Sequence, residues 1–517
     1  MNRLDGARSN PYGTVQIRAG LIHFFIGRGI AFILVSGASL ILVRFMPIKD
    51  YAVFSTLIGL QIFLVATASL GLDRVITRFI PEVRLCGDTD SLTRLIWWSL
   101  GLRLGGLCAV IMPIMILIPQ ISAFLNAEGY ESAFEAMLVC TLLFGLSQHL
   151  MRSLQAIMEQ TAVKRALLCE SLSKFMIITG WVLLNNLEIG VTETVWIAAA
   201  CVGLALLVQV MILRRILRSL DRSKRGWRAP YREIFRLGRN NYLQTLLLLP
   251  SEPPSLRLVG AYVLAAPAMA AYGFFQTLIG TMRRNLPIQL LLDILEPAIL
   301  SRYAQTGNFR NLNSSTNSMI KINAYFILPV IGWLLVAGES MTSILTGGKY
   351  VEYSWVLIAL MVALLYESHW IALRTVANAV GQYDALVKGG LWAVLGVIGM
   401  VAMLTWQPDY KLTILTLGVS GILLLQNFMA VWRMRGAGHS YTIDGIGLAR
   451  LILAATIATG FSWAAKLVLS PGPLLQVLLT SVVMALIYIV IVREIKAFRE
   501  DERYMFSQMS KRLEWLV

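Results

Sequence analysis

Long apolar stretches recur along the whole chain and are separated by short polar segments. Most are about 17 to 25 residues long, and at about 1.5 Å rise per residue such a helix crosses the ~30 Å hydrocarbon layer of a bilayer. Because backbone polar groups must pair internally in lipid, the pattern predicts an all-α polytopic membrane protein with about 14 transmembrane helices. We expect these helices at residues 19–43, 51–72, 95–118, 133–151, 166–184, 194–213, 237–263, 268–300, 322–338, 354–373, 389–406, 412–432, 451–469 and 474–492.

The composition leads to the same class. Hydrophobic residues make up 57% of the 517 residues and charged residues only 14%. No single soluble core could bury so much apolar surface, so a bilayer must act as the solvent.

Lysine and arginine are divided unevenly between the loops. Alternate loops and the two chain ends hold about 34 of the 45 basic residues, and the opposite loops hold about 6. Because short cytoplasmic loops retain basic residues, the asymmetry predicts a multi-pass protein of the bacterial inner (plasma) membrane with both termini in the cytoplasm. Orientation accounts for most of the net charge of +16, so we expect no nucleic-acid partner.

The longest basic connection separates two halves of the chain. We expect an N-terminal six-helix bundle at 1–213, a basic cytoplasmic linker at 214–239 and a second six-helix bundle at 240–435. Two additional transmembrane helices at 448–492 and a cytoplasmic amphipathic tail at 493–517 would follow.

Residues on either side of the linker recur at a nearly constant offset. Arg78 matches Arg302 at an offset of 224, and Arg152 matches Arg374 at an offset of 222. Such echoes are typical of transporters built from two bundles in a pseudo-twofold repeat, with a substrate site between them. The alternative is that membrane-protein loops share Arg, Gly and Ser by composition alone.

Several charged residues fall inside the apolar stretches. Arg28, Arg103, Arg283 and Arg284 lie where a charge costs roughly 2.5 to 3.5 kcal/mol on insertion scales, so each should face a partner or a wet cavity. Their excess over carboxylates predicts a cationic interior that binds a phosphate-bearing substrate, because guanidinium groups donate paired hydrogen bonds to phosphate oxygens. The alternative is that each arginine neutralises a carboxylate or caps carbonyls at a helix break. The candidate carboxylates are Glu170 and Glu367, with Asp293 and Glu296 nearer the cytoplasmic end, so no matching set lies at the depth of the arginines.

The eighth predicted helix adds hydrogen-bonding groups beside one of these arginines. Tyr272, Gln276, Gly280 and Arg283 recur at steps of four, four and three residues and so share one helix face. We therefore predict that Tyr272 and Gln276 also bind substrate, through sugar-type hydrogen bonds. Arg284 points about 100 degrees away from this face.

Two further features concern the control of transport. Glu367 and His369 in the tenth predicted helix either couple transport to ions by carrying protons or form a satisfied polar pair. In the seventh predicted helix Pro253 and Pro254 remove backbone donors, so regular helix cannot continue there. With Arg257 they either form a gate near the outer surface or belong to a plain loop.

The sequence shows no motif for a cofactor or a metal. It has no GxxxxGK[ST] phosphate loop, and its five cysteines are scattered without pair spacing. The loops assigned to the outside are too short to fold into a catalytic domain. We therefore expect no cofactor, no metal and no enzymatic activity.

Three segments make the chain resemble a known family. GLDRVITRFIPE at 71–82, LRLVGAYVLAAPAMAAYGFFQTL at 256–278 and ILEPAILSRYAQTGN at 294–308 are similar to the O-antigen and exopolysaccharide lipid flippases. That family is the polysaccharide-transporter branch of the multidrug/oligosaccharidyl-lipid/polysaccharide exporter superfamily. Family members often carry an acidic residue before the arginine of the seventh helix, where this chain has Ser255 before Leu256-Arg257.

The resemblance implies a function and a set of partners. It implies a flippase that moves an undecaprenyl-pyrophosphate-linked oligosaccharide across the inner membrane by alternating access, alongside membrane lipids, a polysaccharide polymerase and chain-length machinery. The alternatives are an ion-coupled multidrug exporter of the same superfamily and, with less support, a membrane glycosyltransferase or polysaccharide polymerase. An arginine-rich interior disfavours the organic cations that such an exporter would be expected to bind.

Overall fold

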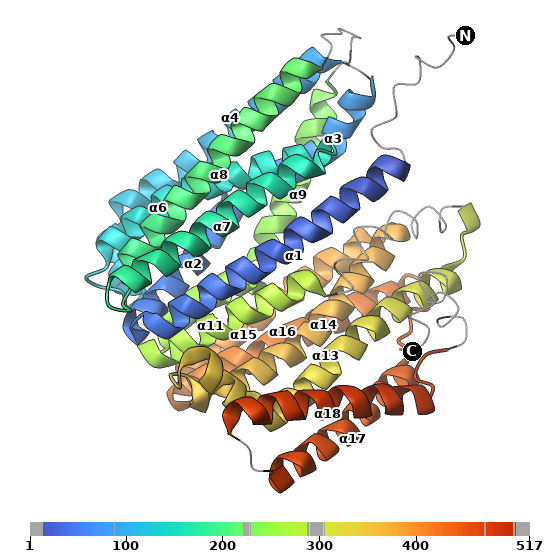
Figure 1. Ribbon diagram of the computed structural model, residues 1–517. Coiled ribbons are helices and arrows are strands. Elements are labelled where there is room, and N and C mark those ends of the chain that lie inside the picture. The colour runs from blue at the N-terminus through green and yellow to red at the C-terminus, as the bar shows by residue number, and fades with distance from the viewer. Residues whose placement is uncertain are drawn as a thin grey trace, which may run out of the picture. The chain divides into compact units, whose positions relative to one another are not determined.

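The computed structural model describes most of the chain, with side chains from Gly27 onward. Regular secondary structure in these residues is helical throughout (Figure 1). Among them, twelve helices are long and apolar enough to cross a membrane. The described residues are 14–86, 88–220, 227, 229–286, 289, 303, 305–469, 472–499 and 502.

These helices confirm the predicted all-α polytopic class. The twelve correspond to the first six and the last six of the fourteen predicted spans. The predicted span at 237–263 is instead interrupted after Leu248, and the one at 268–300 can be followed as a helix only to Asn285. Outside the described residues lie Asp293, Glu296, most of the segment 294–308 and 503–517 of the predicted tail.

The chain divides into two compact units, Met1–Tyr262 and Val263–Val517. The division falls after the predicted linker at 214–239, so the helix Tyr231–Leu248, which begins within that linker, belongs to the first unit. The first unit contains α1 (Thr14–Phe45), α2 (Ile48–Thr67), α3 (Leu72–Cys86), α4 (Thr89–Ile116), α5 (Ile118–Phe124), α6 (Glu131–Ala156), α7 (Gln160–Leu184), α8 (Val191–Ser219), α9 (Tyr231–Leu248), η1 (Leu249–Ser251) and nearly all of α10 (Pro253–Val263).

The second unit is also helical throughout its described residues. Its described elements are α11 (Ala266–Asn285), α13 (Phe309–Thr346), η2 (Val351–Tyr353), α14 (Ser354–Ala379), α15 (Tyr383–Trp406), η3 (Pro408–Tyr410), α16 (Lys411–Gly436), α17 (Gly445–Leu469) and α18 (Pro473–Glu494).

Within the first unit, α1 packs on α7, and α6 packs on α4 and α8. The amphipathic helix α3 lies across the ends of these helices and buries Val75, Ile76 and Phe79 in a core shared with α4, α6, α7, α8 and α9. Burying three such side chains stabilises the unit by several kcal/mol at roughly 1.5 to 3 kcal/mol each. The segment 71–82, which carries the family resemblance, is therefore a packing element at this end of the helices.

The charged residues of this segment also join elements of the first unit. Asp73 forms an ion pair with Arg152 of α6, and Arg78 forms one with Glu233 of α9. Glu82 accepts a hydrogen bond from the indole of Trp227 at 3.2 Å. The polar face of α3 thus attaches the predicted linker region to the first unit.

Gly71 allows α3 to approach α9 closely. Its backbone has φ +68°, a left-handed conformation that glycine adopts without a steric penalty. A Cβ at this position would come 1.9 Å from the carbonyl oxygen of Gly238. No side chain larger than hydrogen fits there, so Gly71 is required by the crossing of two backbones.

Asp88 caps α4 and holds the linker region to it. Its carboxylate accepts hydrogen bonds from the Ser91 N–H at 2.9 Å and from the Trp227 N–H at 3.1 Å. The Ser91 N–H is the chief cause of a lowered pKa of Asp88, and the Trp227 N–H lowers it further. A cap that also binds a remote backbone group couples helix α4 to the connection after α8.

Replacing Asp88 with alanine is expected to cost about 1 to 2 kcal/mol of stability at neutral pH, because a cap and a second backbone hydrogen bond are lost. Folding lowers the pKa of Asp88. This contribution to stability is therefore complete above the pKa that Asp88 has in the unfolded chain, and it disappears as the pH falls through the pKa that Asp88 has in the folded protein. Thermal unfolding of both proteins at pH 7 and near pH 3 would measure it. The exposed Asp409→Ala is the control, and an Asp88→Ala deficit of equal size at both pH values would contradict the prediction.

In the second unit the two C-terminal helices pack on α13. Both α17 and α18 contact α13, and they share with it a core that includes Tyr325, Leu451 and Tyr488. On its other sides α13 packs on α14, which in turn packs on α11 and α16. The two helices that are additional to the predicted repeat therefore share a hydrophobic core with α13.

A buried ion cluster surrounds Lys321, which lies in the N-terminal half of α13. The Lys321 ammonium, whose side chain is 1% exposed, is 2.8 Å from Asp444 Oδ2 and also pairs with Glu502. Arg499 Nη2 lies 3.3 Å from Asp444 Oδ1, and its backbone N–H donates to Glu502 Oε2 at 2.8 Å. The cluster joins α13, the connection before α17 and the segment after α18.

Candidate functional site

The predicted substrate-binding stripe lies on α11, which begins with a proline in its first turn and packs on α14. Gln276 Nε2 donates to Tyr272 Oη at 2.6 Å, so the two side chains lie along one face as their spacing predicts. Both are buried: Tyr272 is 0% and Gln276 8% exposed. Their role in binding substrate remains a prediction.

Arg283 lies on α11 and meets a carboxylate from α14. Its Nη1 is 3.0 Å from Glu367 Oε1, and the two side chains are 32% and 21% exposed. The pair matches the alternative in which a membrane arginine neutralises a carboxylate. It is also accessible, so an anionic ligand could compete with Glu367 for the guanidinium.

Glu367 and His369 do not form a pair with each other. Residues two apart on a helix point in different directions, and His369 Nε2 instead lies 3.1 Å from the hydroxyl of Tyr441. The two rings stack with centroids 5.9 Å apart. Tyr441 is a partner that the sequence could not indicate, because it lies in the polar connection before α17.

Arg284 follows Arg283 on α11 and is exposed. Its Nε donates to the carbonyl of Gly280 on its own helix at 3.2 Å. The helical step of about 100 degrees between neighbouring residues places Arg284 on a different face of α11 from Arg283.

In the first unit Arg103 is buried between α4 and α2. Its side chain is 3% exposed, and Nη2 donates to the Val65 carbonyl at 3.0 Å. Val65 lies in the last turn of α2, whose final carbonyls have no partner within the helix. Tyr242 donates to the neighbouring Thr67 carbonyl at 2.9 Å. Arg103 thus caps a helix end, the second role considered for such arginines.

A histidine that the sequence did not suggest lies near Arg103. His149 Nε2 is 3.0 Å from Ser99 Oγ, one turn before Arg103 on α4, and the histidine is 1% exposed. Within the described part of the chain, His149 Nδ1 and the Nε and Nη1 of Arg103 have no hydrogen-bond partner. In the sequence, only the position of His149 near the end of the apolar stretch 133–151 could have drawn attention to it.

Arg28 is half-buried on α1 of the first unit. This helix packs on α7, which also carries the candidate carboxylate Glu170. Binding of substrate by Arg28 remains a prediction.

The predicted gate coincides with a break in the helical chain. The α-helix α9 ends at Leu248, a 3-10 turn follows, and Glu252 has extended backbone before α10 begins at Pro253. Ser255, the residue that departs from the family pattern, donates through its hydroxyl to the Leu249 carbonyl at 2.5 Å. The break is observed, and the gating role stays a prediction.

Arg257 and Pro254 lie against α2 rather than at an exposed surface. Arg257 is 7% exposed, and a Cβ on Gly59 would come 2.9 Å from the Arg257 Cβ and 3.2 Å from the Pro254 carbonyl oxygen. The close approach requires the glycine. Any opening at this place must separate α10 from α2.

No group of three or more metal-binding side chains occurs among the described residues. The titratable side chains described above contact single partners instead: Glu367 contacts Arg283, His369 contacts Tyr441, and His149 contacts Ser99.

No family model and no curated protein matches the sequence. The fold is an all-α polytopic architecture that is shared with several solved structures. The lipid II flippase MurJ, in an inward closed conformation, is similar with a TM-score of 0.65 at 10% identity, over 92% of this chain and 99% of that chain.

Two transporters of the MOP superfamily are also similar. An inward-facing multidrug resistance MATE family transporter has a TM-score of 0.61 at 16% identity, over 80% of this chain and 95% of that chain. A transporter from Pyrococcus furiosus, described by a reversed polarity of its binding pocket, has a TM-score of 0.51 at 15% identity, over 83% and 95%. At these identities the likeness is one of fold.

Proposed function

We propose that this protein is a flippase that moves a polyprenyl-pyrophosphate-linked oligosaccharide across the bacterial inner membrane by alternating access. The observation that carries the proposal is the accessible Arg283 on α11, within a MOP-type fold whose apolar helices contain more arginine than carboxylate. The likeness to a lipid II flippase over 92% of the chain supports it. Partners would be the lipid-linked substrate and membrane lipids, with polysaccharide polymerase and chain-length machinery.

Arginine suits the proposed substrate for two chemical reasons. The guanidinium group is charged at every cellular pH, and its planar fork donates two parallel hydrogen bonds to phosphate oxygens. A pyrophosphate carries more charge than one carboxylate, so it can displace Glu367 from Arg283. After the substrate is released, Glu367 would again form its ion pair with Arg283, so the two charges compensate each other in the empty site.

An ion-coupled multidrug exporter is the second candidate. It is favoured by the likeness to a MATE family transporter and by an acidic residue within a membrane helix, Glu367. In that case Glu367 would bind a proton or an organic cation, and Arg283 would only compensate the charge of Glu367 when it is ionised.

Transport by proteoliposomes separates these candidates. Vesicles with the full chain and a fluorescent undecaprenyl-pyrophosphate oligosaccharide in one leaflet should show protein-dependent transfer to the other leaflet, measured by quenching from outside. Protein-free vesicles are the control. Export of a cationic dye without lipid transfer would reject the flippase and support the exporter.

A further inference from the structure

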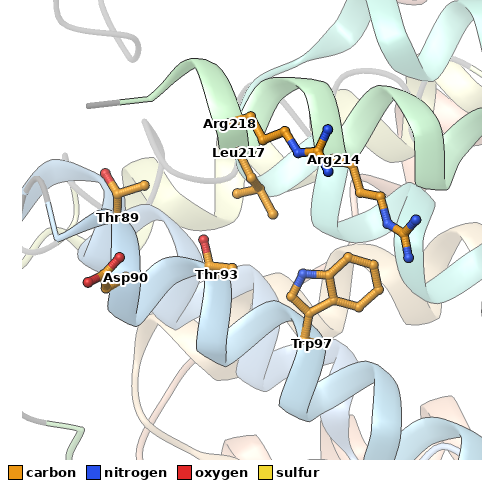
Figure 2. Close-up of a pocket in the computed structure, with 7 residues that line it drawn as sticks. All are labelled: Thr89, Asp90, Thr93, Trp97, Arg214, Leu217 and Arg218. Atoms are coloured by element: carbon orange, nitrogen blue, oxygen red, sulfur yellow. The ribbon is translucent and has the colours of Figure 1, made fainter. Parts of the chain in front are cut away.

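The ends of α4 and α8 in the first unit enclose a surface pocket of about 620 Å³ (Figure 2). On α4 Thr89, Thr93 and Trp97 recur every four residues, and Arg214 and Arg218 do so on α8, so each helix presents one face. Asp90 and Leu217 complete the lining. The basic-residue pattern of the loops places this end of both helices at the cytoplasmic surface.

In the described part of the chain, no carboxylate forms an ion pair with Arg214 or Arg218 of the pocket. Arg214 lies over the Trp97 ring, with Cζ 5.7 Å from the ring centroid. Both arginines are exposed, and among the described residues neither forms an ion pair. Two cations face one carboxylate, Asp90, so the pocket has a net positive charge and favours an anionic ligand.

The face of α8 that carries these arginines continues as an apolar stripe. Leu204, Leu207, Met211, Arg214 and Arg218 recur at steps of three and four residues and so follow one line along the helix. The three apolar side chains are 46%, 62% and 62% exposed. The stripe therefore changes from exposed apolar side chains to guanidinium groups at the helix end.

We propose that this pocket binds the headgroup of an anionic phospholipid, with an acyl chain lying along the stripe. The phosphodiester would bind Arg214 and Arg218, and the threonine hydroxyls would bind headgroup oxygens. Trp97 suits the membrane–water interface, where its ring is apolar and its N–H remains wet. A free phosphate would use the arginines but would have no need of the stripe.

Native mass spectrometry of the full-length protein with dioleoyl-phosphatidylglycerol tests the proposal. The double variant Arg214→Ala/Arg218→Ala should weaken binding about 25-fold, since each arginine near an anionic headgroup contributes a factor of about five. The control Arg215→Ala/Arg165→Ala removes equal charge from exposed positions outside the pocket and should leave binding within twofold. Equal weakening in both double variants would overturn the proposal.

Competition identifies the source of the phosphate. Dioleoyl-phosphatidylcholine, inorganic pyrophosphate and undecaprenyl pyrophosphate should each fail to displace phosphatidylglycerol at equal concentration. Displacement by inorganic pyrophosphate would make this a site for a free anion, and preferential displacement by undecaprenyl pyrophosphate would make it part of a substrate path. Either result would overturn the phospholipid assignment.

A measurement on the unmodified protein guards against variants that fail to fold. Phosphatidylglycerol with a photoreactive group midway along one acyl chain should label the peptide that contains Leu204, Leu207 and Met211. Labelling spread evenly over exposed helices such as α15 and α16 would contradict the proposal.

Discussion

Replacing Arg283 with alanine is expected to reduce transfer of the lipid-linked oligosaccharide about 10- to 100-fold, the loss expected when a hydrogen bond to a charged group is removed. Arg283 is accessible, at 32% side-chain exposure, and already lies beside a displaceable carboxylate, Glu367. Initial rates in proteoliposomes at matched protein content would measure the loss. Arg310→Ala, which removes an exposed charge from the end of α13, is the control and should change the rate less than twofold.

A second variant separates substrate recognition from charge pairing. Arg283→Ala removes the ion pair between Arg283 and Glu367, and Arg283→Ala/Glu367→Gln removes the charge of the carboxylate as well. If Arg283 binds the pyrophosphate, the double variant stays as slow as the single one. Recovery of transport in the double variant would show that Arg283 serves only to neutralise Glu367.

Replacing Lys321 with methionine is expected to cost about 3 to 5 kcal/mol of stability, the range found when one partner is removed from a buried ion pair. Asp444 and Glu502, whose side chains are 9% and 4% exposed, would lose the ammonium that compensates them. At roughly 2 to 4 °C per kcal/mol for a unit of this size, the melting temperature should fall by roughly 6 to 20 °C. Lys388→Met breaks an ion pair whose side chains are 42% and 51% exposed, and it should change the melting temperature far less, because solvent screens exposed pairs.

The pH dependence of the same cluster gives an independent check. Burial opposes ionisation of Asp444, but hydrogen bonds from Lys321 and the Gly447 N–H, with the charges of Lys321 and Arg499, outweigh it and lower its pKa. The stabilisation is therefore present above the unfolded pKa and is lost as the pH falls through the folded one. The melting temperatures of the wild type and Lys321→Met should converge in acid. An equal effect of Lys388→Met, or a Lys321→Met deficit that does not change with pH, would contradict this account.

Several parts of the site could be predicted because they depend on local spacing. Tyr272 and Gln276 are four residues apart, so helical geometry alone places their side chains together. The run of prolines after Leu249 removes backbone donors, so a break in the seventh helix follows from the chemistry of proline.

Other parts could not be predicted because they depend on contacts between distant segments. Arg283 and Glu367 come from different helices, and nothing in either helix indicates which carboxylate an arginine will meet. Arg103 was expected to face a partner or a cavity, and only the end of α2 beside it shows that the partner is the Val65 carbonyl. Glu367 and His369 are two residues apart on one helix and so cannot face each other, but only the structure shows that Arg283 and Tyr441 are their partners.

The sequence by itself determined the class of this protein, because apolar length and composition decide whether a chain is dissolved by water or by lipid. Only the tertiary structure decided which buried charges are compensated and by what. Lys321, Asp444 and Glu502 are far apart in the chain and close in space. A buried charge must be compensated by a group close to it, because an unpaired charge in a low dielectric is costly. The packing of the helices decides which group is close enough.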